Sequence, residues 1–160
     1  MKRLSENLET TQTLAEEWLK NHLFLQKEPQ KQATVVFLSG DLGSGKTTFA
    51  QHLAKSLGVK RTVPSPTFVI RRDYNLKTNP SGYKKLIHID FYRLKGPEEL
   101  KTIGWEEILK NPENLILVEW PERVGEGSVN SNFHLHFRTL DENSREIIFS
   151  AWWKIILNTR

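Results

Sequence analysis

Residues 40–47 read Gly-Asp-Leu-Gly-Ser-Gly-Lys-Thr, which places two glycines and a Lys-Thr pair at the spacing GxxxxGK[ST]. An apolar, β-branched run of strand length precedes this segment at residues 34–38. After it, apolar residues recur at helical spacing until Gly58, which is placed to end a helix. A glycine-rich loop between a strand and a helix presents backbone N–H groups and the positive end of the helix dipole to phosphate. The sequence therefore predicts a loop that binds the phosphates of a nucleoside triphosphate.

The residues of this loop have separate expected roles. Lys46 is expected to reach the β- and γ-phosphates, and the Thr47 hydroxyl is expected to be a ligand of Mg²⁺. A chance glycine-rich turn is the alternative, and the strand and helix patterns on its two sides argue against it. The full set of residues expected to contact the nucleotide is Asp41, Leu42, Gly43, Ser44, Gly45, Lys46, Thr47 and Thr48.

Two carboxylates end short apolar runs further along the chain. Glu119 follows residues 115–118, and Asp90 ends the run at residues 86–90. An acid at such a strand end can hold Mg²⁺ or orient the water that attacks the phosphate. Either acid is able to take either role. We expect Glu119 to hold the metal together with Thr47, and Asp90 to act in turnover.

A threonine between the loop and the two acids is a candidate switch residue. Thr67 lies in the segment Val-Pro-Ser-Pro-Thr-Phe at residues 63–68, where two prolines stiffen the approach to it. In switch-type nucleotide hydrolases a loop threonine closes over the γ-phosphate and Mg²⁺. An ordinary turn leading into a strand is an equal alternative for this segment.

Composition indicates a compact domain without disulfides. A chain of 160 residues predicts one domain, residues 1–160, and the absence of cysteine excludes a disulfide frame or a cysteine-based zinc site. The N-terminus lacks the apolar core of a signal peptide and no stretch is long and apolar enough to span a bilayer, so we expect a cytoplasmic protein. The net charge of +4 only weakly favours anionic partners.

Hydrophobic periodicity predicts alternating helices and strands. A capping-box pattern at Thr13–Glu16 and an apolar stripe that includes Leu8 predict a first helix over residues 11–23. A turn or loop is expected at 75–82, and the C-terminal segments are expected to pair as an antiparallel hairpin. The other predicted elements are strands at 34–38, 62–72, 86–91 and 115–118, a helix at 97–109, and hairpin strands at 134–137 and 146–153.

Several other residues have a structural and a functional interpretation. We expect Arg93 to form a structural ion pair and His88 to be structural. A half-exposed Trp120 would cover the nucleotide or face a partner protein, and burial in the core is an equal alternative for it. His134 and His136 share a strand face without an evident third metal ligand. The basic pairs at 60–61, 71–72 and 84–85 are typical of solvated edges, and would form a docking surface for tRNA or an acidic protein if they converge.

Four motifs in this order resemble those of the bacterial TsaE (YjeE) family. They are Gly-Asp-Leu-Gly-Ser-Gly-Lys-Thr-Thr-Phe at 40–49, Ser-Pro-Thr-Phe at 65–68, His-Ile-Asp-Phe-Tyr-Arg-Leu at 88–94 and Val-Glu-Trp-Pro-Glu at 118–122. The resemblance covers essentially the whole chain. Ser44 stands where alanine is more usual, and a small residue suits the loop. The positions that match family motifs are Lys46, Thr47, Thr67, Asp90, Glu119 and Trp120.

The resemblance implies a fold and a function. The implied fold is α/β, with a P-loop NTPase-like central sheet of parallel and antiparallel strands, flanking helices and a C-terminal antiparallel hairpin. The implied activity is hydrolysis of ATP with Mg²⁺, in which Thr67, Asp90 and Glu119 are the catalytic residues. The family acts with TsaD and TsaB, which transfer threonylcarbamoyl to adenosine 37 of ANN-decoding tRNAs. Contact with tRNA would then occur through that complex.

Two other classes share part of this pattern. A small-molecule kinase would also have the phosphate loop, but no compact arginine-rich lid follows the central strands. A GTPase switch would have Asn-Lys-x-Asp and Asp-x-x-Gly motifs, and neither occurs. The sequence offers no confident arginine finger, and enzymes of this type that lack one turn over slowly. We therefore expect a slow ATPase, with the kinase as the alternative.

Overall fold

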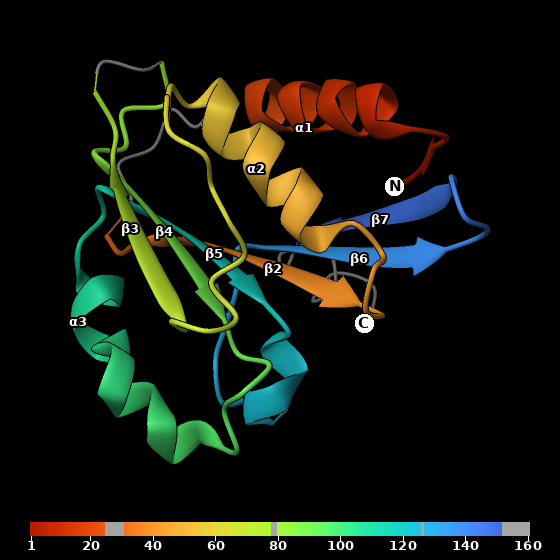
Figure 1. The fold of residues 1–160 in the computed structure, drawn as a ribbon. Helices are drawn as coiled ribbons and strands as arrows, with labels where there is room; N and C mark the ends of the chain where they lie inside the picture. Colours follow the sequence, from red (N-terminus) through yellow and green to blue (C-terminus); the bar gives the residue numbers. More distant parts are fainter. Residues whose placement is uncertain (25–30, 78–79, 126, 152–160) are drawn as a thin grey trace, which may run out of the picture.

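A seven-stranded sheet forms the centre of the computed structural model, which describes residues 1–24, 31–77, 80–125 and 127–151 (Figure 1). The strand order is β1-β7-β6-β2-β5-β4-β3. Strands β4, β5, β2 and β6 are parallel neighbours, whereas β3, β7 and β1 pair antiparallel. This mixed sheet with its C-terminal β6–β7 hairpin confirms the predicted fold class. The strands are β1 Lys2–Ser5, β2 Thr34–Gly40, β3 Arg71–Asn75, β4 Lys85–Asp90, β5 Asn114–Glu119, β6 Phe133–Thr139 and β7 Arg145–Ala151.

Helices cover the two faces of the sheet (Figure 1). On one face lie α1, Leu8–His22, and α2, Lys46–Ser56; on the other lie the 3₁₀ helix η1, Pro97–Ile103, and α3, Trp105–Lys110. The short 3₁₀ helix η2, Pro121–Val124, follows β5 on this second side. Every residue of β5 is buried, and so is every residue of β2 except Gly40. Burial on both faces explains why these two strands are continuous apolar runs rather than alternating ones.

The first helix begins three residues earlier than predicted. Asn7 is its N-cap, and the Asn7 side chain accepts a hydrogen bond from the Thr10 N–H at 2.8 Å. The predicted capping box is wrong, since Thr13 lies inside the helix and donates to the Glu9 carbonyl. Leu8 is 64% exposed and so lies outside the buried stripe. The asparagine cap determines the start because it satisfies a free N–H group of the first turn.

Other elements also differ from the prediction. The predicted strand at 62–72 is irregular up to residue 70, and only β3 is extended, because Pro64 and Pro66 cannot donate to a strand ladder. The predicted helix at 97–109 is interrupted at Gly104, whose φ of +66° separates η1 from α3. Strand β1 was not predicted and pairs with β7.

Parts of two predicted elements fall outside the described residues. These are residues 78–79 of the predicted turn and 152–153 of the last strand. Among the described residues, none of the helices combines the length and the apolar character needed to cross a membrane.

Candidate nucleotide-binding site

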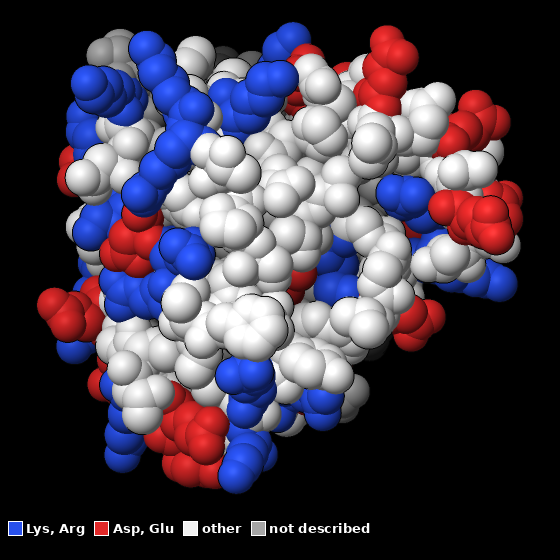
Figure 2. Space-filling model, in the orientation of Figure 1, with Lys and Arg blue, Asp and Glu red and all other residues white. Residues whose placement is uncertain are grey.

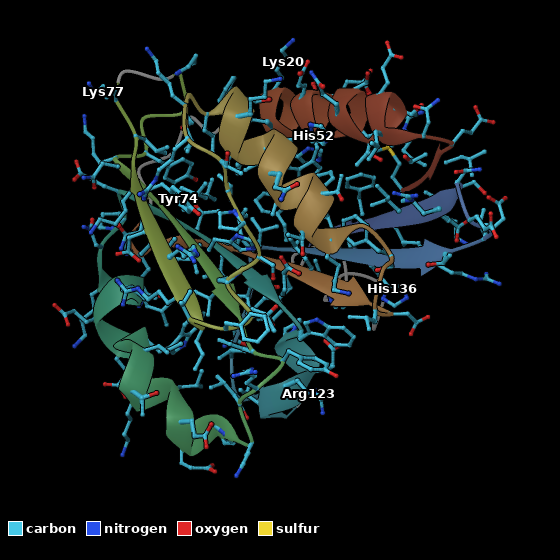
Figure 3. The ribbon with its side chains drawn as sticks, viewed as in Figure 1. Lys20, His52, Tyr74, Lys77, Arg123 and His136 are labelled. Atoms are coloured by element: carbon cyan, nitrogen blue, oxygen red, sulfur yellow. The ribbon has the colours of Figure 1, made fainter. Side chains whose placement is uncertain are left out.

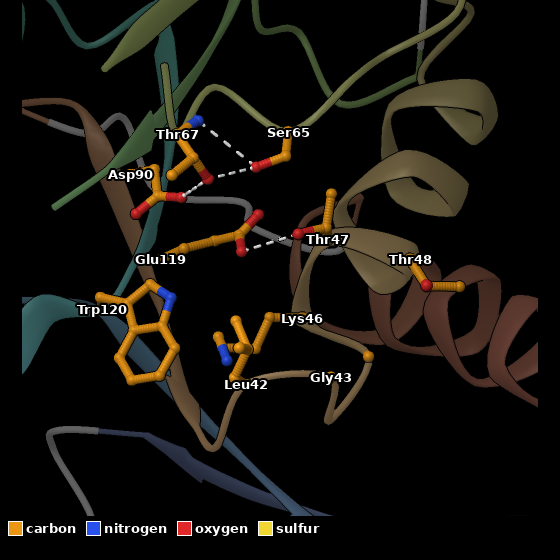
Figure 4. A pocket seen from close by; sticks show the side chains of 11 residues that line it. Leu42, Gly43, Lys46, Thr47, Thr48, Ser65, Thr67, Asp90, Glu119 and Trp120 are labelled. Atoms are coloured by element: carbon orange, nitrogen blue, oxygen red, sulfur yellow. Dashed lines mark hydrogen bonds between the residues drawn. The ribbon is translucent and has the colours of Figure 1, made fainter. Parts of the chain in front are cut away.

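The candidate site lies where the parallel strands end at one edge of the sheet. Strands β2, β4 and β5 finish at Gly40, Asp90 and Glu119, and Asp90 pairs in register with Glu119. Together with the loop after β2, these ends enclose a cavity of about 200 Å³ (Figure 4). Of the expected nucleotide contacts, Asp41 and Ser44 do not line it. The lining residues are Leu42, Gly43, Gly45, Lys46, Thr47, Thr48, Ser65, Thr67, Asp90, Glu119 and Trp120.

Glycine is required at two positions of the phosphate loop. Gly40 has φ +127°, and a Cβ atom there would lie 2.1 Å from the Phe137 carbonyl oxygen of β6. Gly45 has φ +100° and is the N-cap of α2, and it makes no side-chain capping hydrogen bond. The N–H groups of the first turn of α2 are therefore available to an anion. This backbone fits the phosphates of a nucleotide.

Lys46 is buried inside the loop and bonded to the backbone. Only 4% of its surface is exposed, and its Nζ donates to the carbonyls of Gly40 at 2.6 Å and Asp41 at 2.7 Å. The ammonium also lies 4.0 Å from the centre of the Trp120 ring. Burial lowers the pKa of Lys46 below its ordinary value, and the negative charges around it, that of Glu119 first, oppose this shift. Phosphate oxygens would replace the carbonyls as hydrogen-bond acceptors.

A chain of hydrogen bonds joins α2, β5 and β4 behind the cavity. The Thr47 hydroxyl donates to Oε2 of Glu119 at 2.8 Å, and Nε2 of His88 is bonded to Oε1 at 2.8 Å. Glu119 is 2% exposed and His88 is fully buried. A hydroxyl and a carboxylate side by side are oxygen ligands of the kind that Mg²⁺ prefers. Thr47 and Glu119, the two expected metal ligands, therefore lie in contact.

The sequence did not indicate His88 as part of the site. Its ring is buried like that of a structural residue, but its bond to Glu119 places it directly behind an expected metal ligand. A signal was present, because His88 lies two residues before Asp90 in β4 and alternate strand residues share a face. The missing information was the position of Glu119 beside that face.

The segment before β3 is attached to the second acid. The Thr67 hydroxyl donates to Oδ2 of Asp90, and the Ser65 and Thr67 hydroxyls are hydrogen-bonded at 2.6 Å (Figure 4). Oδ1 of Asp90 accepts from the Tyr92 N–H at 2.8 Å, which fixes the carboxylate. The segment ends at Ile70, which has φ +65°. Positive φ is rare for a β-branched residue and stores conformational strain at this point.

The structure also shows the surroundings of the residues for which the sequence allowed both a structural and a functional role. These are Trp120, Arg93, His134 and His136. Trp120 is half-buried, with φ +57°. Arg93 forms no ion pair with any residue that the structure describes, contrary to expectation; its guanidinium lies 4.7 Å from the centre of the exposed Phe68 ring. His134 and His136 both reach the Ser39 hydroxyl, at 2.7 and 2.9 Å.

Basic residues gather on and beside the edge strand β3. The Arg61 guanidinium donates to the Asp73 carbonyl and lies over the Tyr74 ring, while Arg71 and Lys85 pair with the Asp73 carboxylate. Two of the three predicted basic pairs thus contribute to the same salt-bridge cluster on β3. Figure 3 shows Lys77 and Tyr74 far from His136, and Figure 2 shows positive side chains concentrated on the side of the molecule where β3 lies.

The comparisons with known proteins all point to one family. The sequence model described as "Threonylcarbamoyl adenosine biosynthesis protein TsaE" matches residues 5–147. The TsaE protein of Bacillus subtilis is 36% identical over 121 residues, which are 76% of this chain and 72% of that protein. The TsaE protein of Rickettsia felis is 37% identical over 131 residues, or 81% of this chain and 72% of that protein.

A solved structure has the same fold. The crystal structure of YdiB from Bacillus subtilis superimposes with a TM-score of 0.62 and 26% sequence identity, over 99% of this chain and 92% of that one. The match therefore includes the candidate site as well as the sheet. The sequence, the fold and the phosphate loop agree, and the chain belongs to the TsaE family.

Proposed function

We propose that this chain is a Mg²⁺-dependent ATPase that supports the N6-threonylcarbamoyladenosine modification of adenosine 37 in ANN-decoding tRNAs. One observation carries the proposal: the phosphate loop, the Thr47–Glu119 pair and the Thr67–Asp90 pair meet in one cavity. The relatives' names, tRNA threonylcarbamoyladenosine biosynthesis protein, supply the pathway. We infer from this pathway that the protein acts in the cytoplasm.

Some residues of the cavity bind the nucleotide and its metal, and others take part in hydrolysis. Backbone N–H groups at the start of α2 bind phosphate oxygens, and Lys46 exchanges its carbonyl partners for the β- and γ-phosphates. Thr47 and Glu119 would hold the metal, and a bound Mg²⁺ would neutralise the charge that develops on the phosphates. Asp90, fixed by the Tyr92 N–H, orients the attacking water, and Thr67 positions Asp90.

The isolated protein should hydrolyse ATP slowly. No arginine lines the cavity among the described residues. An arginine supplied in trans accelerates such reactions by about 10³–10⁵-fold in related phosphate-loop enzymes. The useful rate would then be that of an assembly rather than of the free chain.

The surface around the cavity suits a protein partner, and we assign it to a TsaD–TsaB complex. Figure 2 shows mostly uncharged surface there. Exposed apolar side chains in such a position are typical of interaction sites. Phe68 and Val69 follow Thr67 directly in the chain. Because Thr67 contacts Asp90, a bound nucleotide can change the conformation of the segment that carries these two residues. The exposed apolar residues assigned to this surface are Leu42, which is 81% exposed, Phe68, 80%, Val69, 51%, and Tyr92, 39%.

Calorimetric titration of this chain with TsaD–TsaB tests the proposal. The affinity should be at least about fivefold higher with ATP than with ADP or without nucleotide, which is an ordinary coupling between two sites. Thr67→Ala should reduce this difference more than it reduces ATP affinity. The control is Thr102→Ala, because Thr102 is exposed and bonds only to the Glu99 carbonyl of η1. Equal partner affinity under all three nucleotide conditions would exclude the coupling.

A further inference from the structure

The cavity at the end of β2 accounts for only part of a nucleotide. Its volume of about 200 Å³ is below the 300–1,000 Å³ typical of whole small-molecule sites. Thr67, Asp90 and Glu119, which the proposed function places at the γ-phosphate, all lie on the β5–β4 side of β2. The nucleoside must therefore leave the loop on the opposite side, over the ends of β6 and β7.

One basic side chain lies against the loop on that side. Arg145 is the first residue of β7, and β7 runs antiparallel to β6, so it begins at the edge where the cavity lies. A Cβ atom on Gly45 would lie 3.1 Å from Nη1 of Arg145 and 3.2 Å from its Cδ. The guanidinium thus touches the outer side of the phosphate loop without lining the phosphate cavity.

Arg145 is half-buried, and one hydrogen bond to the backbone restrains its guanidinium. Its Nη2 donates to the Asn143 carbonyl at 3.1 Å. Asp141, on the same turn, accepts hydrogen bonds from the N–H groups of Asn143 and Ser144. The pKa of Asp141 is lowered first by its hydrogen bond from the Ser144 hydroxyl, and the charge of Arg145 adds a smaller contribution. Arg145 forms no ion pair within the described part of the chain.

We propose that the Arg145 guanidinium stacks on the purine base of the bound nucleoside triphosphate. A planar guanidinium stacks well on aromatic faces, and this one is fixed beside the path by which the nucleoside leaves the loop. A phosphate contact is disfavoured because Arg145 lies outside the phosphate cavity. The inference rests on the proposed function, since it takes the bound molecule to be a nucleotide.

Inorganic triphosphate has the phosphates of ATP but no base, so comparing the binding of the two ligands distinguishes a base contact from a phosphate contact. Calorimetry with ATP and with inorganic triphosphate, both with Mg²⁺, is done on wild type, Arg145→Ala, Arg145→Lys and Arg138→Ala. Arg145→Ala should weaken ATP binding by about tenfold, as expected for a partly desolvated cation–π contact, and change triphosphate binding by less than about twofold. Arg145→Lys should resemble Arg145→Ala, because lysine keeps the charge but not the plane. Arg138→Ala is the matched control: Arg138 is an exposed arginine of the same hairpin, and both affinities should stay unchanged.

Other results would overturn the inference in distinguishable ways. An equal loss for ATP and triphosphate would make Arg145 a phosphate ligand, and wild-type ATP affinity in Arg145→Lys would reduce its role to charge. Unchanged ATP binding in Arg145→Ala would remove any role while leaving the proposed function intact. If wild type bound neither ligand, the proposed function would fail as well. Thermal melting checks that each variant folds, and Arg145→Lys carries the test if Arg145→Ala does not fold.

Discussion

The buried polar side chains of the candidate site are hydrogen-bonded to one another or to the backbone. Both carboxylate oxygens of Glu119 and both of Asp90 accept hydrogen bonds, and the Lys46 ammonium is bonded to two carbonyls. Loss of one partner leaves a buried polar group unpaired, which costs about 1–3 kcal/mol. Substitutions here should therefore keep shape, so that a change in chemistry is not confused with loss of folding.

Conservative amide variants should separate the two acids. Glu119→Gln removes a charge next to Thr47, so it should raise the Mg²⁺ concentration needed for ATP binding and lower turnover. Asp90→Asn should leave ATP affinity within about twofold and lower turnover by about 10²-fold or more. ATP binding and single-turnover hydrolysis over a Mg²⁺ series measure both effects. Reversed patterns would exchange the two roles, and normal hydrolysis in both variants would remove the two-acid mechanism.

His134 should make the fold sensitive to mild acid. Burial lowers the pKa of His134 below its ordinary value of 6.5, and the charge of His136 lowers it further. Below pH 6.5 the unfolded chain therefore binds more protons here than the folded chain, and stability falls as the pH decreases through the lowered pKa. The groups around His134 are the Ser39 hydroxyl, the Phe37 ring and, along the adjoining cavity, Asp41 and Glu122.

Urea unfolding between pH 7.5 and pH 5 measures this effect. His134→Gln should lose less stability over that range than wild type. Some slope should remain, because burial also lowers the pKa of His52 on α2, and the charge of Lys55 adds to that shift. Identical slopes in the two proteins would show that His134 does not contribute.

At the scale of elements, glycines determine how the phosphate loop and α2 begin and end. Because Gly40 has no Cβ atom, β2 can lie in contact with the Phe137 backbone. Gly58 follows the end of α2, and its N–H donates to the Lys55 carbonyl at 3.0 Å. The predicted end of this helix at Gly58 is therefore confirmed. Both glycines have positive φ, but only Gly40 is crowded, so the two positions test different physical effects.

Gly40→Ala and Gly58→Ala should differ in their effect on stability. Alanine at Gly58 meets no atom within 4 Å, so it should cost only the about 1–2 kcal/mol of a left-handed residue. At Gly40 the same change also forces the β2 and β6 backbones apart, so we expect about 3 kcal/mol or more and weaker ATP binding. Guanidinium unfolding measures both variants. Equal costs would show that the β2–β6 contact yields without strain.

At the scale of the whole molecule, the sheet separates two apolar cores. One lies under α1 and α2 and contains Phe49, whose ring makes edge contacts with Trp18 and Phe137. The other lies under η1 and α3, where Phe91 packs on Trp105. Phe49 lies in α2 two residues after Thr47, so the packing of the first core also sets the position of the phosphate loop.

Phe49→Ala and Phe68→Ala compare a buried and an exposed phenylalanine. Phe49 is fully buried, so its loss should cost about 3–5 kcal/mol, a large part of the stability of a small protein. Phe68 is 80% exposed, and its loss should change stability by less than about 0.5 kcal/mol. Urea denaturation gives both values. A large loss for Phe68→Ala would mean that the segment before β3 is part of the folded core.

The sequence alone determined the elements whose signals are local. The phosphate loop, its flanking strand and helix, the two acids after apolar runs and the C-terminal hairpin were all predicted, because spacing and periodicity along the chain encode them. The start of α1 was encoded by Asn7 but hidden by a second capping pattern at Thr13. The roles predicted for Thr67, Asp90 and Glu119 remain predictions.

Only the tertiary structure decided which distant residues touch. The β4–β5 register brings His88 to Glu119, although 31 residues separate them along the chain. Antiparallel pairing brings Arg145 to Gly45 and joins β1 to β7, and neither contact has a local signal. Such contacts depend on strand order and register, which are set by burial of the whole sheet rather than by the pattern of any one segment.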